Sequence, residues 1–167
     1  MYKLVMTSGK RKKTILDPKG TRYYDANDYS IVVKVTYGNT SLLLTGDAEA
    51  VSESQIVSNG SDLTITVLKV GYHGSRVSTG DSFQDKVNHK LAVISMGKGN
   101  SYGHTTQKVM NRLQARGILV YRTDENRTIV ATSNENDVTF NTDPGSHNGM
   151  SSESTEVQHL NLYQCQS

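Results

Sequence analysis

The sequence lacks several features that would assign it to a particular class of protein. It contains one cysteine, Cys165, which cannot form a disulfide within a single chain, so nothing points to an oxidising compartment. No apolar run approaches the roughly 20 residues that span a membrane, and residues 1–6 are too interrupted for the apolar core of a secretory leader. We therefore expect no membrane segment and a cytoplasmic location by default.

An excess of one charge is also missing. The 18 Lys and Arg residues against 16 Asp and Glu residues leave a formal net charge of +2, which gives no general attraction to nucleic acid or anionic lipid. Aromatic residues are not clustered either, so a stand-alone nucleic-acid-binding protein is disfavoured. The basic run from Lys10 to Lys13 could contact phosphates, but short charge runs are usually solvated, and we interpret it as an exposed hairpin tip.

What is present is a regular order of strand-like and helix-like segments in a chain whose length fits one domain. The pattern predicts strands at 2–6, 14–16, 30–37, 41–44, 63–70, 91–95, 118–121, 128–132 and 138–140, and helices at 48–57, 80–87 and 105–116. The alternation between 41 and 121 predicts an α/β layer flanked by antiparallel hairpins. We expect the domain to cover residues 1–140 and the polar residues 141–167 to form a loose tail.

Polar side chains follow two of the predicted strands. Asp47 comes after the strand 41–44 and a Thr-Gly pair, and His73 follows the strand 63–70 in a turn flanked by glycines. The segment between them fits one helix and one strand, a crossover that returns to the same sheet edge. A carboxylate there can bind a cation, although Asp47 could instead cap the next helix. For His73, two interpretations are open: it is a ligand, or its ring is hydrogen-bonded to backbone groups of the turn.

A glycine-rich loop follows the next predicted strand and leads to His104. Its glycines allow a ligand to approach the backbone, and Asn100 can contact a phosphate or carboxylate. His104 precedes a helix, so we interpret it as a substrate-side acid, base or hydrogen-bond donor, with a polar helix cap as the alternative. Ser75 and Ser78 offer hydroxyls near a helix start, a setting that suits an anion.

Three segments together resemble a known family. They read NDYSIVVKVTYGNTSLLLTGDAE, LKVGYHGS and LAVISMGKGNSYGHTTQKVMNRLQARGILVYRT, and they lie in the same order and at compatible spacing. Over roughly residues 13–140 the chain resembles the C-terminal half of metallo-β-lactamase-fold hydrolases, above all the soluble domain of ComEC-type DNA-uptake proteins. The resemblance implies half of an αββα sandwich, with a mixed sheet, helices on one face and flanking hairpins, and a site that holds two metal ions, usually zinc.

The resemblance also implies roles for the residues at the strand ends. Asp47 matches the carboxylate that bridges the metals, and His73 matches a late histidine ligand. His104, as the catalytic candidate, matches a loop that closes the site on the substrate side. Substrate or anion binding is implied for four further residues: Ser75, Ser78, Asn100 and Tyr102.

The chain departs from the family pattern in two places. Tyr72 stands where a second histidine is common, and no histidine precedes His73, so the His-x-His-x-Asp-His motif is missing. Asp47 and His73 supply two ligands, whereas catalytic zinc sites have three from protein. We therefore expect a phosphodiesterase- or nuclease-type hydrolase that is inactive as an isolated chain, with a non-catalytic binding or dimerisation module as the alternative.

These departures also bear on partners. Half of a sandwich exposes an apolar sheet face, which is unfavourable in water, so we expect a homodimer or a complex with a complementary half-domain chain. Zinc is the expected cofactor of the partial metal site formed by Asp47 and His73. Nucleic acid is expected only as a substrate.

Overall fold

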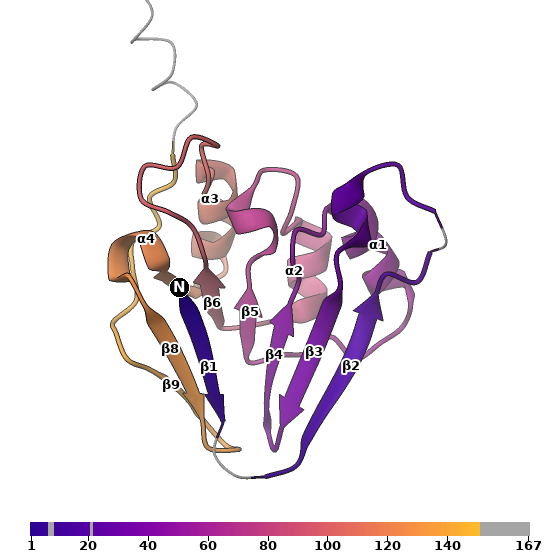
Figure 1. The fold of residues 1–167 in the computed structure, drawn as a ribbon, viewed down its shortest axis with the longest axis horizontal. Helices are drawn as coiled ribbons and strands as arrows, with labels where there is room; N and C mark the ends of the chain where they lie inside the picture. Colours follow the sequence, from indigo (N-terminus) through magenta and orange to yellow (C-terminus); the bar gives the residue numbers. More distant parts are fainter. Residues whose placement is uncertain (7–8, 21, 151–167) are drawn as a thin grey trace, which may run out of the picture.

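The computed structural model describes residues 1–6, 9–20 and 22–150, and its centre is a six-stranded mixed sheet (Figure 1). The strands follow one another across the sheet in chain order: β2 (Arg11–Asp17), β3 (Val32–Tyr37), β4 (Thr40–Leu44), β5 (Val67–Lys69), β6 (Leu91–Ile94) and β7 (Leu119–Arg122). Pairing is antiparallel from β2 to β4 and parallel from β4 to β7. The predicted α/β layer and the hairpin within 30–44 are confirmed.

Three helices connect the parallel strands and cover one face of this sheet (Figure 1). They are α1 (Ala50–Ser58), α2 (Asp81–Val87) and α3 (Gln107–Ala115). On α3 the spacing of Val109, Met110 and Leu113 places all three on one face, and each is fully buried. They share a core with side chains such as Leu68 and Val120 from the sheet, so burial of these apolar groups fixes the helices to the sheet.

A second, three-stranded sheet corrects one prediction. It contains β1 (Tyr2–Met6), β8 (Ile129–Ser133) and β9 (Val138–Phe140), with β1 parallel to β8. The predicted hairpin between the first two strands is therefore wrong, because β2 pairs with β3 in the large sheet. The basic run lies mostly inside β2 rather than at a hairpin tip. Leu4 packs against the apolar core between the two sheets, which we call the second core, and this long-range burial outweighs the local turn signal.

The small sheet packs on the face of the large sheet that the helices leave open. Leu42, Val67 and Val93 of the large sheet form a core there with Ile129, and the Tyr121 and Phe140 rings stack with centroids 3.7 Å apart. The molecule is thus an α/β sandwich with helices on one face of a mixed sheet, as predicted.

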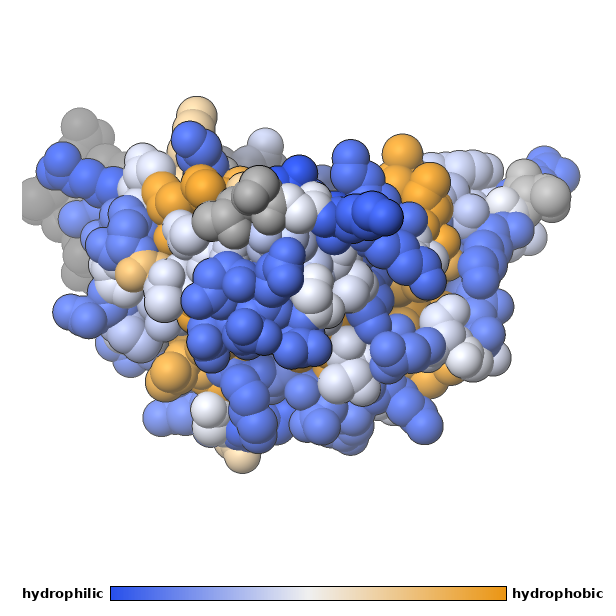
Figure 2. All heavy atoms as spheres, turned by 90° about the horizontal axis from the view of Figure 1, so that it is seen from below, coloured by the Kyte–Doolittle hydropathy of each residue, from blue (hydrophilic) through white to orange (hydrophobic). Residues whose placement is uncertain are grey.

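The cover over this face is incomplete. Ile15 of β2 pairs with Val33 and so points to the same face as the second core, yet 63% of it is exposed. Apolar surface is visible on the side of the molecule where β2 lies (right side of Figure 2). The described residues therefore leave apolar surface uncovered around Ile15 at the β2 edge of the sheet, next to the exposed Lys13 on the same face.

Three short helical segments complete the described chain: η1 (Ala26–Tyr29), η2 (Gly71–Gly74) and α4 (Thr123–Asn126). Residues 141–150, the first part of the predicted tail, run along β7 to the start of α3, and the Gly145 N–H donates to the Val120 carbonyl at 2.7 Å. Residues 151–167 lie outside the described part of the chain. Among the described residues, no helix has the length and apolar character needed to cross a membrane.

Candidate functional site

The carboxyl ends of β4, β5 and β6 bring the predicted site residues to one edge of the large sheet. Asp47 follows β4, the Gly71–Gly74 turn follows β5, and the loop 96–104 follows β6. Parallel strands end at the same edge, where ligands bind in α/β sheets. The sequence-predicted convergence of Asp47, His73 and His104 is therefore realised in space.

The Asp47 and His73 side chains face each other. His73 Nε2 lies 3.5 Å from Asp47 Oδ1, while His73 Nδ1 lies 2.5 Å from the Ser95 carbonyl oxygen. A carbonyl oxygen only accepts, so Nδ1 carries the proton and donates to it. Nε2 faces Asp47, where a doubly protonated ring pairs with the carboxylate and a neutral ring presents the lone pair that a metal ion would need, with the Ser95 carbonyl as its outer hydrogen-bond partner.

This pair fits part of a zinc site. Two ligands at about 2.05 Å from a tetrahedral zinc ion are about 3.3 Å apart, close to the observed Nε2–Oδ1 separation. Imidazole and carboxylate are also ligands that zinc accepts. Within residues 1–6, 9–20 and 22–150, however, no three His, Cys, Asp or Glu side chains come together as a metal-binding group. The described residues thus offer two ligands and no third.

The helix-capping alternative for Asp47 is not realised. Helix α1 begins at Ala50 with Glu49 as its N-cap, and the Asp47 N–H donates to the Ser30 hydroxyl at 3.1 Å. Asp47 therefore does not cap α1, and its carboxylate lies at the rim with 44% of the side chain exposed.

The turn that carries His73 has an unfavourable backbone. Tyr72 and His73 have φ values of 44° and 53°, in the left-handed region that costs a residue with a side chain about 1–3 kcal/mol. Contacts around the turn hold it: the Tyr72 N–H donates to the Gly46 carbonyl, and the buried Ser78 hydroxyl donates to the Gly71 carbonyl at 2.7 Å. This backbone aims both the Tyr72 and the His73 ring at the rim.

Ser75 and Ser78, the two serines predicted to bind an anion, follow the His73 turn. Both are buried, at 6% and 1% exposure, and Ser78 also donates to the Ser75 carbonyl. Their role in anion binding stays a prediction. The Ser78 hydroxyl supports the turn from beneath.

His104 lies between two tyrosine rings at the same rim. Its ring meets Tyr72 edge to face at 5.4 Å and lies 6.1 Å from Tyr102, which is 82% exposed. Asn100 holds the backbone of His104 from both sides, since its Oδ1 accepts the His104 N–H and its Nδ2 donates to the His104 carbonyl. Burial lowers the pKa of His104, nearby His73 lowers it further, and Asp47 opposes the shift. A neutral imidazole can accept a proton or donate its N–H.

The capping alternative for His104 is not realised either. The N-cap of α3 is Thr106, and the helix begins at Gln107. The start of this helix is tied to the His73 turn, because Thr105 Oγ1 and the Thr106 N–H both donate to the Gly74 carbonyl, at 3.2 and 3.0 Å. The His73 turn and the His104 loop thus form one connected rim.

Two residues near this rim were not predicted from the sequence. Lys69, at the end of β5, is 7% exposed, and burial lowers its pKa while Asp47 opposes that shift. The sequence feature that could have indicated Lys69 is that it is a single lysine inside an apolar run. Glu53 of α1 is buried and accepts the N–H groups of Thr79 and Gly80, so it fixes the loop beyond the His73 turn. Nothing in the local sequence distinguishes Glu53 from a surface helix residue.

Comparison with known proteins confirms the expected similarity to competence proteins. The chain is 41% identical over 115 residues to ComE operon protein 3 of Bacillus subtilis, covering 69% of this chain and 15% of that protein. It is 39% identical over 110 residues to competence protein ComA of Neisseria gonorrhoeae (65% of this chain, 16% of that protein). Identity to recombination protein 2 of Haemophilus influenzae is 40% over 99 residues (59% and 12%). No family model matches the sequence.

These similarities are to one segment of much longer proteins. The match spans 12–16% of the length of these relatives. The chain is therefore homologous to a part of competence-type proteins, and the activity of a whole relative does not transfer with that part.

Proposed function

We propose that this chain is one half of a metallo-β-lactamase-like phosphodiesterase or nuclease site and needs a second polypeptide to complete it. Asp47 and His73 would each give one ligand to a zinc ion. The observation that carries this proposal is the facing pair of Nε2 and Oδ1, with the far ring nitrogen held by the Ser95 carbonyl. The homology to competence-type proteins supports it.

The other residues at the rim would stabilise the leaving group and contact the substrate. A bound zinc ion would supply an acidified water and polarise a phosphoryl oxygen. The His104 imidazole lies at the rim, where its N–H can donate to a leaving oxygen. Asn100 holds the loop backbone, and the exposed Tyr102 ring offers a flat surface to a base or sugar of the substrate. Nucleic acid enters this proposal as substrate only.

Zinc binding tests the ligand pair. By titration calorimetry, we expect the chain to bind zinc weakly, and Asp47→Ala and His73→Ala each to lower the affinity more than about tenfold, since even outer-sphere changes at metal sites cost about 10–100-fold. Asp137→Ala changes an exposed aspartate far from the rim in sequence and serves as control. Zinc affinity that neither ligand substitution changes would overturn the proposed site.

Hydrolysis tests the missing half. The isolated chain should hydrolyse bis(p-nitrophenyl) phosphate no faster than background. Addition of a polypeptide that carries a His-x-His-x-Asp-His segment should raise the rate, and His104→Ala should abolish the gain. A mixture that binds zinc fully yet stays inactive would support the second candidate below.

The second candidate is a non-catalytic binding or dimerisation module. Tyr72 favours it, because its ring packs against His104 at a position where the family commonly has another histidine. The apolar face left open around Ile15 favours it as well, since such a face suits a second copy or a complementary half-domain. Hydrolysis by the mixture with the second polypeptide, lost in His104→Ala, separates the two candidates.

A further inference from the structure

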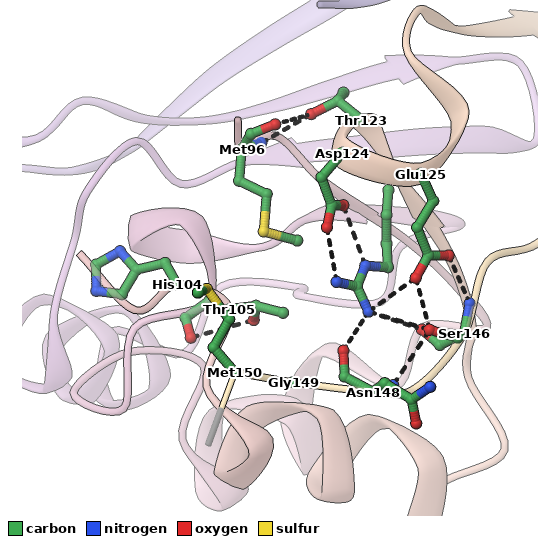
Figure 3. Close-up of polar contacts among 12 residues, drawn as sticks. Met96, His104, Thr105, Thr123, Asp124, Glu125, Ser146, Asn148, Gly149 and Met150 are labelled. Atoms are coloured by element: carbon green, nitrogen blue, oxygen red, sulfur yellow. Dashed lines mark hydrogen bonds and ion pairs between the residues drawn. The ribbon is translucent and has the colours of Figure 1, made fainter. Parts of the chain in front are cut away.

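Residues 145–150, which we name the C-terminal strap, lie against the loop that carries His104. The Met150 N–H donates to the Thr105 carbonyl at 2.7 Å, and Met150 forms an isolated parallel bridge with Thr106. The Gly149 N–H donates to the Gln107 side chain at 2.8 Å. Figure 3 shows Met150 and Gly149 beside Thr105 and His104. The strap thus contacts the junction between the loop 96–104 and helix α3.

One buried arginine holds the strap in place. The Arg122 side chain is 6% exposed and pairs with Asp124 at 2.8 Å and Glu125 at 3.3 Å. It also donates to the carbonyls of Ser146, at 3.2 Å, and Asn148. Asp124, Glu125, Ser146 and Asn148 converge on one point in Figure 3. A buried guanidinium binds its acceptors in a defined geometry, so Arg122 connects the strap backbone to the end of β7 and to α4.

The contacts continue from the strap to the functional rim. Asn100 Nδ2, which brackets the His104 backbone, lies 3.8 Å from Met150 Sδ. At the other end of the loop, the Thr123 hydroxyl accepts the Met96 N–H at 2.8 Å and donates to the Met96 carbonyl at 2.7 Å. Thr123 directly follows Arg122. Both ends of the loop 96–104 are therefore held from the same point at the end of β7.

We propose that Arg122 is a positioning residue for the His104 side of the site, acting through the C-terminal strap. The proposal rests on the proposed function, because it treats His104 and Asn100 as substrate-side groups. Arg122 touches none of the groups at the rim. It fixes the strap, the strap and Thr123 fix the two ends of the loop, and the loop fixes the imidazole relative to Asp47 and His73. A displacement of about 1 Å in such a group can cost about a hundredfold in rate.

Gly149→Ala displaces the strap without touching Arg122. A Cβ at Gly149 would collide with the backbone of Thr106 and Gln107. Gly60→Ala is the matched control, because Gly60 has φ +66°, so alanine there is strained, but no atom lies within 4 Å of the added carbon. Two-dimensional NMR on both variants follows the His104 ring and the Asn100 side-chain amide. We expect Gly149→Ala to shift both signals and Gly60→Ala to shift neither.

A second pair of variants tests the arginine itself. Arg122→Gln removes the charge that holds the strap, and Arg116→Gln removes an ion-paired arginine that contacts Asp81 and Asp85 instead. Loss of stability alone would move the melting temperature of both variants but not the His104 and Asn100 signals of the folded state. Signals that stay at their wild-type positions in Gly149→Ala and Arg122→Gln would overturn the proposal. If Arg122→Gln does not fold, Arg122→Lys, which keeps the charge but loses the planar fork of donors, takes its place.

Ligand affinity separates this proposal from the proposed function. Thymidine 3′,5′-bisphosphate serves as the probe, with zinc in excess. We expect Gly149→Ala to weaken its binding about tenfold, the effect of losing a hydrogen bond to a charged group, and Gly60→Ala to leave it unchanged. If the wild-type chain does not bind the probe even when mixed with the polypeptide that completes the site, the proposed function fails, whereas the NMR signals still support or overturn the role of Arg122.

Discussion

His89 is buried without a partner for either ring nitrogen among the described residues, at 3% exposure. Burial lowers its pKa from 6.5 to about 4, and Arg116 and Lys90 contribute in the same direction. The folded protein therefore keeps His89 neutral at a pH where the unfolded chain binds a proton. Stability should be complete above pH 6.5 and decline as the pH falls toward 4.

We expect this decline to reach about 3 kcal/mol, the free energy that corresponds to the full pKa difference. Urea unfolding at a series of pH values measures it. His89→Leu should unfold with a free energy that changes much less between pH 7 and pH 4.5. An equal decline in the variant would show that other groups cause the acid sensitivity.

Individual site residues were predictable where a polar side chain follows an apolar strand. Asp47, His73, Asn100 and His104 lie at the rim because strand ends in a parallel sheet meet at one edge. Ser78 could not be placed, since its exposure depends on the backbone of the His73 turn, and two successive left-handed residues leave no pattern in a sequence.

Leu113 and Leu119 contrast a buried leucine with an exposed one. Leu113 of α3 is fully buried against the sheet, and Leu119, at the start of β7, is 47% exposed. We expect Leu113→Ala to lower the free energy of unfolding by about 2–5 kcal/mol, because it removes core contacts and leaves a cavity. Leu119→Ala should change it by about 0.5 kcal/mol or less. Urea denaturation of both variants provides the measurement, and similar losses would contradict the assigned helix packing.

Most elements, and the hairpin within 30–44, could be predicted from local pattern, but the long-range pairing of the first strand could not. The helix over 105–116 and the strand over 91–95 were predicted to within two residues of α3 and β6. The first strand was also placed correctly, yet its partner was wrong, because β1 pairs with β8 across almost the whole chain. Pairing at such separation depends on which apolar faces remain to be covered, and a window of sequence does not contain that information.

For the molecule as a whole, the open face around Ile15 predicts association. We expect light scattering to give a mass above the 18.4 kDa of one chain, and Ile15→Glu to return it to that mass, because a charge on this face opposes its burial in an interface. Val51→Glu changes a valine on α1 that is 52% exposed and should leave the mass unchanged.

Two outcomes would count against that association. A wild-type chain that is monomeric at all concentrations would exclude a homodimer and leave a complementary half-domain as the partner. An Ile15→Glu variant that keeps the larger mass would place the interface elsewhere.

The pairing of β1 with β8 also has a consequence for the order of folding. Tyr2 is opposite Ile129 in the small sheet, so β1 has no strand partner until the ribosome has made β8. In the large sheet each strand pairs with the next one along the chain, so each pair can form as soon as its second strand has been made. Closure of a loop this long is slow relative to local pairing. The helical layer and the large sheet can therefore form during synthesis, and the small sheet closes over them afterwards.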